Sequence, residues 1–101
     1  MNKPFDGQVV VITGGARGIG YATAKRLISL GATVAIGDID EATLARAAKD
    51  LGIRTFGRLD VTDPASFFDF LDTVEGELGP IDVLVNNAGI MPVGRIVDED
   101  D

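Results

Sequence analysis

The stretch Val9-Val10-Val11-Ile12-Thr13-Gly14-Gly15-Ala16-Arg17-Gly18-Ile19-Gly20 decides the fold of this chain. Its β-branched run predicts a buried strand, and its glycines, spaced G-x-x-x-G-x-G, predict a tight turn that opens a helix. Glycine leaves no Cβ between peptide N–H groups and a ligand, and a helix N-terminus attracts anions. The turn from Gly14 to Gly20 is therefore a candidate phosphate cradle, although a plain strand-to-helix turn would have the same pattern.

Apolar runs and helical patterns alternate along the rest of the chain. The runs predict strands at 9–13, 33–37, 54–59 and 83–85. Between them, helices are predicted from Gly18 to Gly31, from the capping residue Asp40 to Gly52, and from Thr62-Asp63-Pro64 to Gly79-Pro80. Apolar strands separated by helices predict a parallel sheet covered on both faces. Right-handed crossovers then give an α/β, Rossmann-type doubly wound sheet of four strands in the order 3-2-1-4, and residues 1–101 form one domain.

Apolar residues at helical spacing predict the side of each helix that packs on the sheet. For the first helix these are Ile19, Ala22, Thr23, Arg26, Leu27 and Leu30. For the second they are Leu44, Ala47, Ala48 and Leu51. For the third they are Phe67, Phe70, Leu71, Val74 and Leu78. Phe68 lies off that stripe and is expected to be exposed, and the fourth strand is expected to leave an open sheet edge.

Composition excludes several classes of function. Nine basic and sixteen acidic residues give a net charge of −7, which disfavours nucleic acid as a partner. The chain has no cysteine and no histidine, so we expect neither disulfides nor a metal site. No apolar run is long enough to span a membrane, and no signal-type segment follows the N-terminus, so we expect a cytoplasmic protein.

Asp38 ends the second predicted strand, about 18 residues after Gly20. A carboxylate there can accept hydrogen bonds from both hydroxyls of an adenosine ribose, whereas Asp40 fits better as a helix cap. Because Asp38 would repel a 2′-phosphate, NAD should be preferred over NADP. Arg17 argues for NADP, since a basic residue in the turn can hold that phosphate, but an exposed ion pair contributes only about 0–1 kcal/mol.

Two further segments follow the ends of predicted strands. Asp60-Val61 offers an acceptor for an adenine amino group and an apolar contact for the ring. Asn86-Asn87-Ala88-Gly89 combines asparagines, which tolerate left-handed backbone, with small residues that allow a sugar to approach. An ordinary turn remains an alternative for both.

Together these segments resemble the short-chain dehydrogenase/reductase family, and the resemblance covers essentially the whole chain. Residues 13–20 are similar to its T-G-x-x-x-G-x-G cofactor turn, and Asp38 to its NAD-selecting acid. Asp60-Val61 is similar to its D-V adenine contact, and Asn86-Asn87-Ala88-Gly89 to its N-N-A-G motif. The resemblance implies these cofactor-binding residues: Gly14, Gly15, Ala16, Arg17, Gly18, Ile19, Gly20, Asp38, Ile39, Asp60, Val61, Asn87, Ala88 and Gly89.

The resemblance also implies an NAD(P)-dependent oxidoreductase that transfers hydride between nicotinamide and an alcohol or carbonyl substrate, commonly as a homo-oligomer. The family's catalytic serine, tyrosine and lysine lie in the second half of its subunit, beyond this chain. We therefore assign no catalytic residue and expect the 101 residues alone to be inactive. A non-catalytic module that binds NAD or an adenine nucleotide, and an interaction protein, are the alternatives.

One further match is coincidental. Tyr21-Ala22-Thr23-Ala24-Lys25 fits the family's Y-x-x-x-K spacing, but it directly follows the phosphate turn, away from the expected nicotinamide. We interpret Tyr21 and Lys25 as a surface or packing pair. Ser29 and Ser66 do not occupy plausible catalytic positions either.

Overall fold

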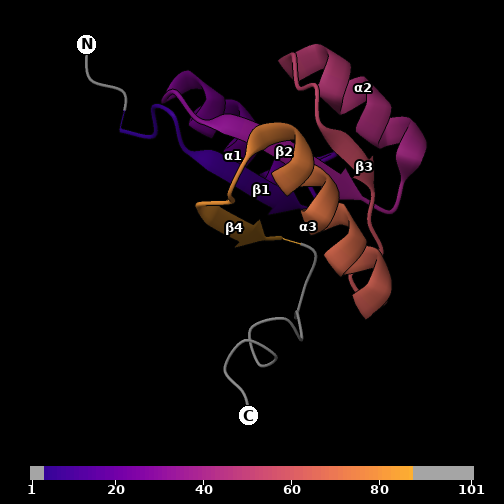
Figure 1. Ribbon diagram of the computed structural model, residues 1–101. Helices are drawn as coiled ribbons and strands as arrows, with labels where there is room; N and C mark the ends of the chain where they lie inside the picture. Colours follow the sequence, from indigo (N-terminus) through magenta and orange to yellow (C-terminus); the bar gives the residue numbers. More distant parts are fainter. Residues whose placement is uncertain (1–3, 88–101) are drawn as a thin grey trace.

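Four parallel strands and three helices make up residues 4–87, the part of the chain that the computed structural model describes (Figure 1). The elements are β1 (Val9–Thr13), α1 (Gly18–Ser29), β2 (Thr33–Asp38), α2 (Glu41–Leu51), β3 (Phe56–Arg58), α3 (Pro64–Leu78) and β4 (Val83–Asn86). Their order in the sheet is β3-β2-β1-β4, and every pairing is parallel. The predicted fold class and strand order are therefore confirmed.

The strand β1 separates two apolar layers. All five of its residues are buried, and alternate side chains point to opposite faces of the sheet. Val10 and Ile12 pack in a cluster with α1 and α2, whereas Val9 and Val11 pack in a cluster with α3 (Figure 1). The helices thus cover both faces of the sheet, and the carboxyl end of β1 leads into the glycine turn.

The third strand is shorter than the predicted 54–59. Only residues 56–58 pair with β2, opposite residues 36–38. Before them, the buried Thr55 donates its hydroxyl hydrogen to Glu77 of α3 (2.8 Å), which ties this segment to the helix layer. Strands β2 and β4 each extend one residue beyond the prediction, to Asp38 and Asn86.

The packing faces of α2 and α3 follow the predicted spacing, and the face of α1 does not. Leu44, Ala47 and Ala48 are buried in α2, and Phe67, Phe70 and Val74 in α3. In α1 the buried residues are Gly20 and Ala24, while the predicted Ile19 is 77% exposed. The reason is close approach: a Cβ on Gly20 would lie 2.0 Å from the carbonyl oxygen of Gly14, so only glycine fits there.

Local signals set the predicted ends of the helices. Asp40 caps α2 by accepting from the N–H of Thr43 (3.1 Å), and Asp63 caps α3 ahead of Pro64. Gly52 ends α2 in the left-handed conformation at φ 72°. β4 is an edge strand of the sheet, and among residues 4–87 its one partner strand is β1. Leu84 of β4 is 36% exposed, and Phe68, which was predicted to be exposed, is 39% exposed. In this part of the chain no helix is long and apolar enough to cross a membrane.

Candidate functional site

The glycine turn lies at the carboxyl end of β1 and is anchored to β2. Its first two N–H groups, on Gly14 and Gly15, donate to the carbonyl of Gly37 (2.8 and 3.3 Å). Gly14 and Gly18 adopt φ of 68° and 60°, which favours glycine. These bonds therefore fix the conformation of the turn, and α1 begins within it, at Gly18.

The glycines of the turn serve different purposes. A Cβ on Gly15 would lie 2.6 Å from Cγ2 of Ile36, and one on Gly20 would strike Gly14, so both are needed for packing. A Cβ on Gly18 would meet nothing within 4 Å. Gly18 thus faces open space at the N-terminus of α1, whose first turn contains no acidic residue. An anionic group can approach the positive end of the helix there.

Asp38 lies beside this turn with spare acceptor capacity. Its Oδ2 accepts from the N–H of Ala16 (3.2 Å), and its Oδ1 accepts from the N–H of Asp40 (3.2 Å). A carboxylate offers about four lone-pair sites. Two backbone bonds therefore fix its orientation and leave acceptors for two ligand hydroxyls.

A hollow of about 190 Å³ opens next to Asp38, at the carboxyl ends of β1, β2 and β3. Three apolar side chains, two carboxylates, a threonine and a glycine line it: Ile39, Leu59, Val61, Asp38, Asp60, Thr62 and Gly14. Leu59 is buried at the bottom of the hollow, and Ile39 is 57% exposed at its rim. An apolar ring system can therefore pack between these two side chains. The structure thus brings the predicted Asp38, Ile39, Asp60 and Val61 together around one cavity.

Asp60 is held in place by the residue two positions on. Its Oδ1 accepts from both the N–H and the hydroxyl of Thr62 (2.9 and 2.6 Å). These bonds, the hydroxyl first, lower the pKa of the Asp60 carboxyl, with a smaller contribution from the charge of Arg58. Asp60 is therefore an ionised acceptor at neutral pH.

The asparagine segment is tied to the end of β1. The buried Thr13 donates its hydroxyl hydrogen to Oδ1 of Asn86 (2.9 Å), and its hydroxyl oxygen accepts from the N–H of Asn87 (3.2 Å). These bonds place Asn87 next to the start of the glycine turn. The predicted Ala88 and Gly89 lie outside the described residues.

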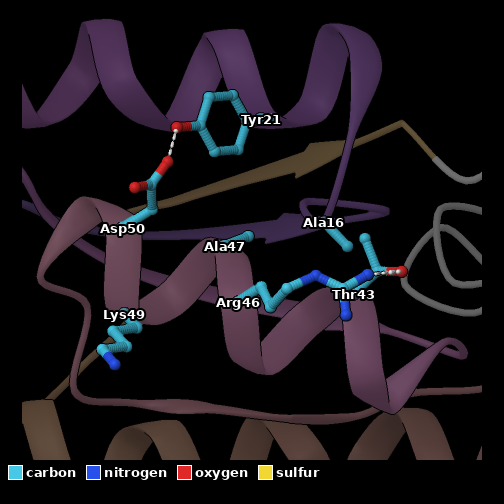
Figure 2. Close-up of a pocket in the computed structure, with 7 residues that line it drawn as sticks. All are labelled: Ala16, Tyr21, Thr43, Arg46, Ala47, Lys49 and Asp50. Atoms are coloured by element: carbon cyan, nitrogen blue, oxygen red, sulfur yellow. Dashed lines mark hydrogen bonds between the residues drawn. The ribbon is translucent and has the colours of Figure 1, made fainter.

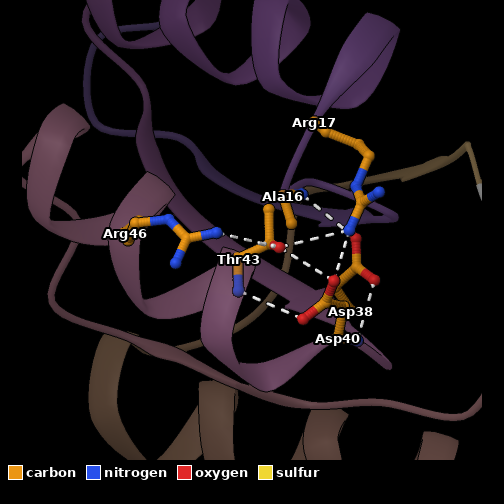
Figure 3. A network of polar contacts seen from close by, with 6 residues as sticks. All are labelled: Ala16, Arg17, Asp38, Asp40, Thr43 and Arg46. Atoms are coloured by element: carbon orange, nitrogen blue, oxygen red, sulfur yellow. Dashed lines mark hydrogen bonds and ion pairs between the residues drawn. The ribbon is translucent and has the colours of Figure 1, made fainter.

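Sequence reasoning missed a polar network beside Asp38 (Figure 3). Arg17 forms an ion pair with Asp40 and donates to the hydroxyl of Thr43 (3.2 Å), and Arg46 donates to the same hydroxyl (3.4 Å). The bonds from Thr43, its hydroxyl first, lower the pKa of the Asp40 carboxyl, and the Arg17 charge lowers it further. The sequence predicts the capping role of Asp40, but it does not predict the ion pair between Asp40 and Arg17.

Tyr21 faces a groove of about 700 Å³ between α1 and α2 (Figure 2). Its hydroxyl donates to Oδ2 of Asp50 (2.6 Å), and that bond raises the pKa of Tyr21. A tyrosine that serves as a general base needs its pKa lowered toward neutrality. The geometry therefore fits the predicted packing role, and Lys25 is exposed on the same helix.

Residues 4–87 also contain no group of acidic side chains placed to hold a metal ion.

Comparison with known proteins decides the family. The family model described as short chain dehydrogenase matches residues 8–101. The chain belongs to the short-chain dehydrogenase family. It is 47% identical to a cis-4-hydroxycyclohexanecarboxylate dehydrogenase from Sinomonas cyclohexanicum, over 89% of this chain and 37% of that protein. It is 41% identical to a 3-beta-hydroxysteroid dehydrogenase from Comamonas testosteroni, over 97% of this chain and 41% of that protein.

Solved structures of this short-chain dehydrogenase type share the fold. A 3-ketoacyl-(acyl-carrier-protein) reductase from Brucella melitensis, crystallised with NADH, superimposes with a TM-score of 0.78 at 36% identity, over 84% of this chain and 35% of that chain. A short chain dehydrogenase/reductase from Burkholderia phymatum, in complex with NAD, gives a TM-score of 0.75 at 36% identity, over 83% of this chain and 31% of that chain. The chain spans about two-fifths of the length of the curated relatives that it matches.

Proposed function

We propose that this chain is the cofactor-binding part of an NAD-dependent oxidoreductase that acts on an alcohol or carbonyl substrate. The observation that carries the proposal is the Asp38 carboxylate, which two backbone bonds fix, one of them from Ala16 of the glycine turn. Family membership and the nicotinamide dinucleotides in the two related crystal structures support it. Bound nicotinamide supplies the hydride chemistry, and the described residues supply binding and orientation.

Each part of the site would bind one part of the dinucleotide. The turn from Gly14 to Gly20 and the N-terminus of α1 would bind the pyrophosphate. Asp38 would accept from the adenosine ribose, and the hollow that includes Ile39, Asp60 and Val61 would hold the adenine. Within the N-N-A-G motif, Asn87, Ala88 and Gly89 would line the site at the end of β4.

The charge of Asp38 favours NAD over NADP. A 2′-phosphate carries about −1.5 to −2 charge at neutral pH and would lie against this carboxylate. The same carboxylate accepts from the two free hydroxyls of NAD, and each such charged hydrogen bond contributes about 1.5–3 kcal/mol. Asp38→Ala should therefore narrow the preference for NAD, measured as the ratio of the two dissociation constants. An unaltered ratio would show that Asp38 does not bind the ribose.

Gly18→Val tests the phosphate cradle. The valine side chain would fill the open space above the turn, so NAD binding should be lost in titration calorimetry of the intact protein. Gly52→Val is the matched control, because Gly52 also has a positive φ (72°) and open space around its Cβ position, but it ends α2. Both variants strain the backbone, and only the first blocks the turn. Equal NAD affinity in the two variants would contradict the assignment of the cradle.

Turnover separates the enzyme from a protein that only binds nucleotide. Alcohol-dependent formation of NADH by the intact protein would support catalysis, and NAD binding without turnover would favour a non-catalytic nucleotide-binding module.

We further propose a cytoplasmic homo-oligomer with no nucleic acid or membrane partner. The net charge of −7 supports the exclusion of nucleic acid.

A further inference from the structure

The ion pair between Arg17 and Asp40 lies immediately beside the proposed ribose site. Arg17 follows Ala16, whose N–H donates to Asp38, and Asp40 donates its own N–H to the same carboxylate (both 3.2 Å). The guanidinium of Arg17 and the carboxylates of Asp38 and Asp40 therefore cluster at one corner of the site (Figure 3). A phosphate on the ribose 2′-oxygen would enter this cluster.

We propose that Asp40 is a specificity-determining residue that holds the Arg17 guanidinium in an internal ion pair and so withholds it from a 2′-phosphate. Discrimination against NADP would then have two sources, because Asp38 repels the phosphate and Asp40 occupies the cation that would bind it. This inference rests on the proposed binding of an adenosine dinucleotide. It differs from that proposal by assigning a role to the Asp40 carboxylate, to which that proposal gives no contact with NAD.

The hydrogen bonds of Asp40 explain why Arg17 would be the partner that moves. The Asp40 carboxylate accepts from the N–H of Thr43 (3.1 Å) and from the Thr43 hydroxyl (2.8 Å). As the cap of α2, it is fixed by the helix itself. The Arg17 side chain is 65% exposed and is the longer and less constrained of the two.

The energetic balance also allows competition for Arg17. Exposed ion pairs are weak, and a phosphate presents more charge and more acceptor oxygens than a carboxylate does. Arg46 adds a second guanidinium, because it donates to the Thr43 hydroxyl that Arg17 also contacts. Without the Asp40 charge, the guanidinium groups of Arg17 and Arg46 would be free to face a 2′-phosphate, and Asp38 would still oppose it.

Asp40→Asn separates the charge of this residue from its capping role. Asparagine caps helices about as well as aspartate does, so α2 should keep its start. The probes are 5′-AMP and adenosine 2′,5′-bisphosphate, titrated calorimetrically into the intact protein. We expect adenosine 2′,5′-bisphosphate to bind the Asp40→Asn variant about threefold to tenfold more tightly than it binds the unmodified protein. The affinity for 5′-AMP should change by less than about twofold. Asp40→Ser, which also keeps a capping oxygen, gives the same test if the asparagine variant does not fold.

Two comparisons test the role of Arg17. Glu41→Gln removes an equal charge from the next residue, which is exposed, and should leave the ratio of the two affinities nearly unchanged. Combining Arg17→Gln with Asp40→Asn should abolish the gain, because the released cation is gone.

The outcomes distinguish this inference from the proposed function. An equal gain in Glu41→Gln, or a gain that persists without Arg17, would overturn the role of Asp40. Binding of 5′-AMP with an unchanged ratio in Asp40→Asn would overturn it as well and leave the dinucleotide site standing. Failure of the unmodified protein to bind either nucleotide would refute the proposed function, and the inference with it.

Discussion

Gly20→Ala is expected to destabilise the protein, although alanine normally stabilises a helix. Gly20 lies in the first turn of α1, and a Cβ there would be 2.0 Å from the carbonyl oxygen of Gly14 and 2.8 Å from its carbonyl carbon. Both are backbone atoms of a turn that is anchored, because Gly14 donates its N–H to Gly37 (2.8 Å). Neither side of the contact can move cheaply.

The magnitude follows from two opposing contributions. Replacing glycine by alanine inside a helix stabilises it by about 0.5–1 kcal/mol. Overpacking against a fixed neighbour costs about 1–3 kcal/mol and sometimes more, and a contact this short belongs at the upper end. Subtracting the first contribution from the second, we expect Gly20→Ala to lower the free energy of unfolding by about 1–2.5 kcal/mol.

Gly76→Ala is the matched control. Gly76 is also helical, in α3, and a Cβ there would meet nothing within 4 Å, so only the stabilising contribution of about 0.5–1 kcal/mol should remain. Urea unfolding of the intact protein, followed by circular dichroism, should separate the midpoints of the two variants by about 1–2 M. If Gly20→Ala is as stable as Gly76→Ala, the close approach of α1 to its own turn is wrong.

Two further predictions concern contacts away from the turn. Asp82→Ala removes the acceptor for the N–H of the buried Val9 (2.8 Å) and should lower the free energy of unfolding by about 1–3 kcal/mol, whereas Asp82→Asn keeps an oxygen acceptor and should lose less in the same urea assay; equal losses would contradict this. Asp50 raises the pKa of Tyr21 above the ordinary 10.0, so this stabilising contribution is complete below pH 10 and is lost as the pH rises through the raised pKa. The tyrosinate absorbance of Tyr21, assigned by subtracting the titration of Tyr21→Phe, should shift to lower pH in Asp50→Asn, and an unmoved titration would argue against the bond.

The capped helix starts and the packing faces of two helices could be predicted because their signals are local, and the strand order because crossovers between parallel strands follow a general rule. Asp40 and Asp63 cap helices within three residues of their own positions, and the stripe from Phe67 to Val74 repeats at helical spacing. The glycine turn and Asp38 could be placed together because parallel strands bring their carboxyl ends to one edge. These features need no knowledge of distant contacts.

The remaining features depend on three-dimensional contacts that helical and strand periodicity do not reveal. The exposed side of α1 is determined by the contact between Gly20 and Gly14, which outweighs the apolar preference of Ile19. The length of β3 depends on how far β2 extends beside it. Arg17 and Asp40 are 23 residues apart, and no spacing rule connects a turn residue with a cap on the next helix. Arg46, in contrast, joins the network through a local contact, because it lies three residues after Thr43 on α2.

The central position of β1 has a consequence for the order of folding. Val9 lies opposite Thr33 of β2, whereas Val10 lies opposite Val83 of β4, about three times further along the chain. Closing the longer loop costs about 1 kcal/mol more chain entropy than closing the shorter one. The first βαβ unit can therefore form early in synthesis, with one flank of β1 unpaired until two more helices have been made. During that interval the unpaired N–H and C=O groups along this apolar strand are open to other chains, so this protein should be most prone to aggregate before β4 emerges.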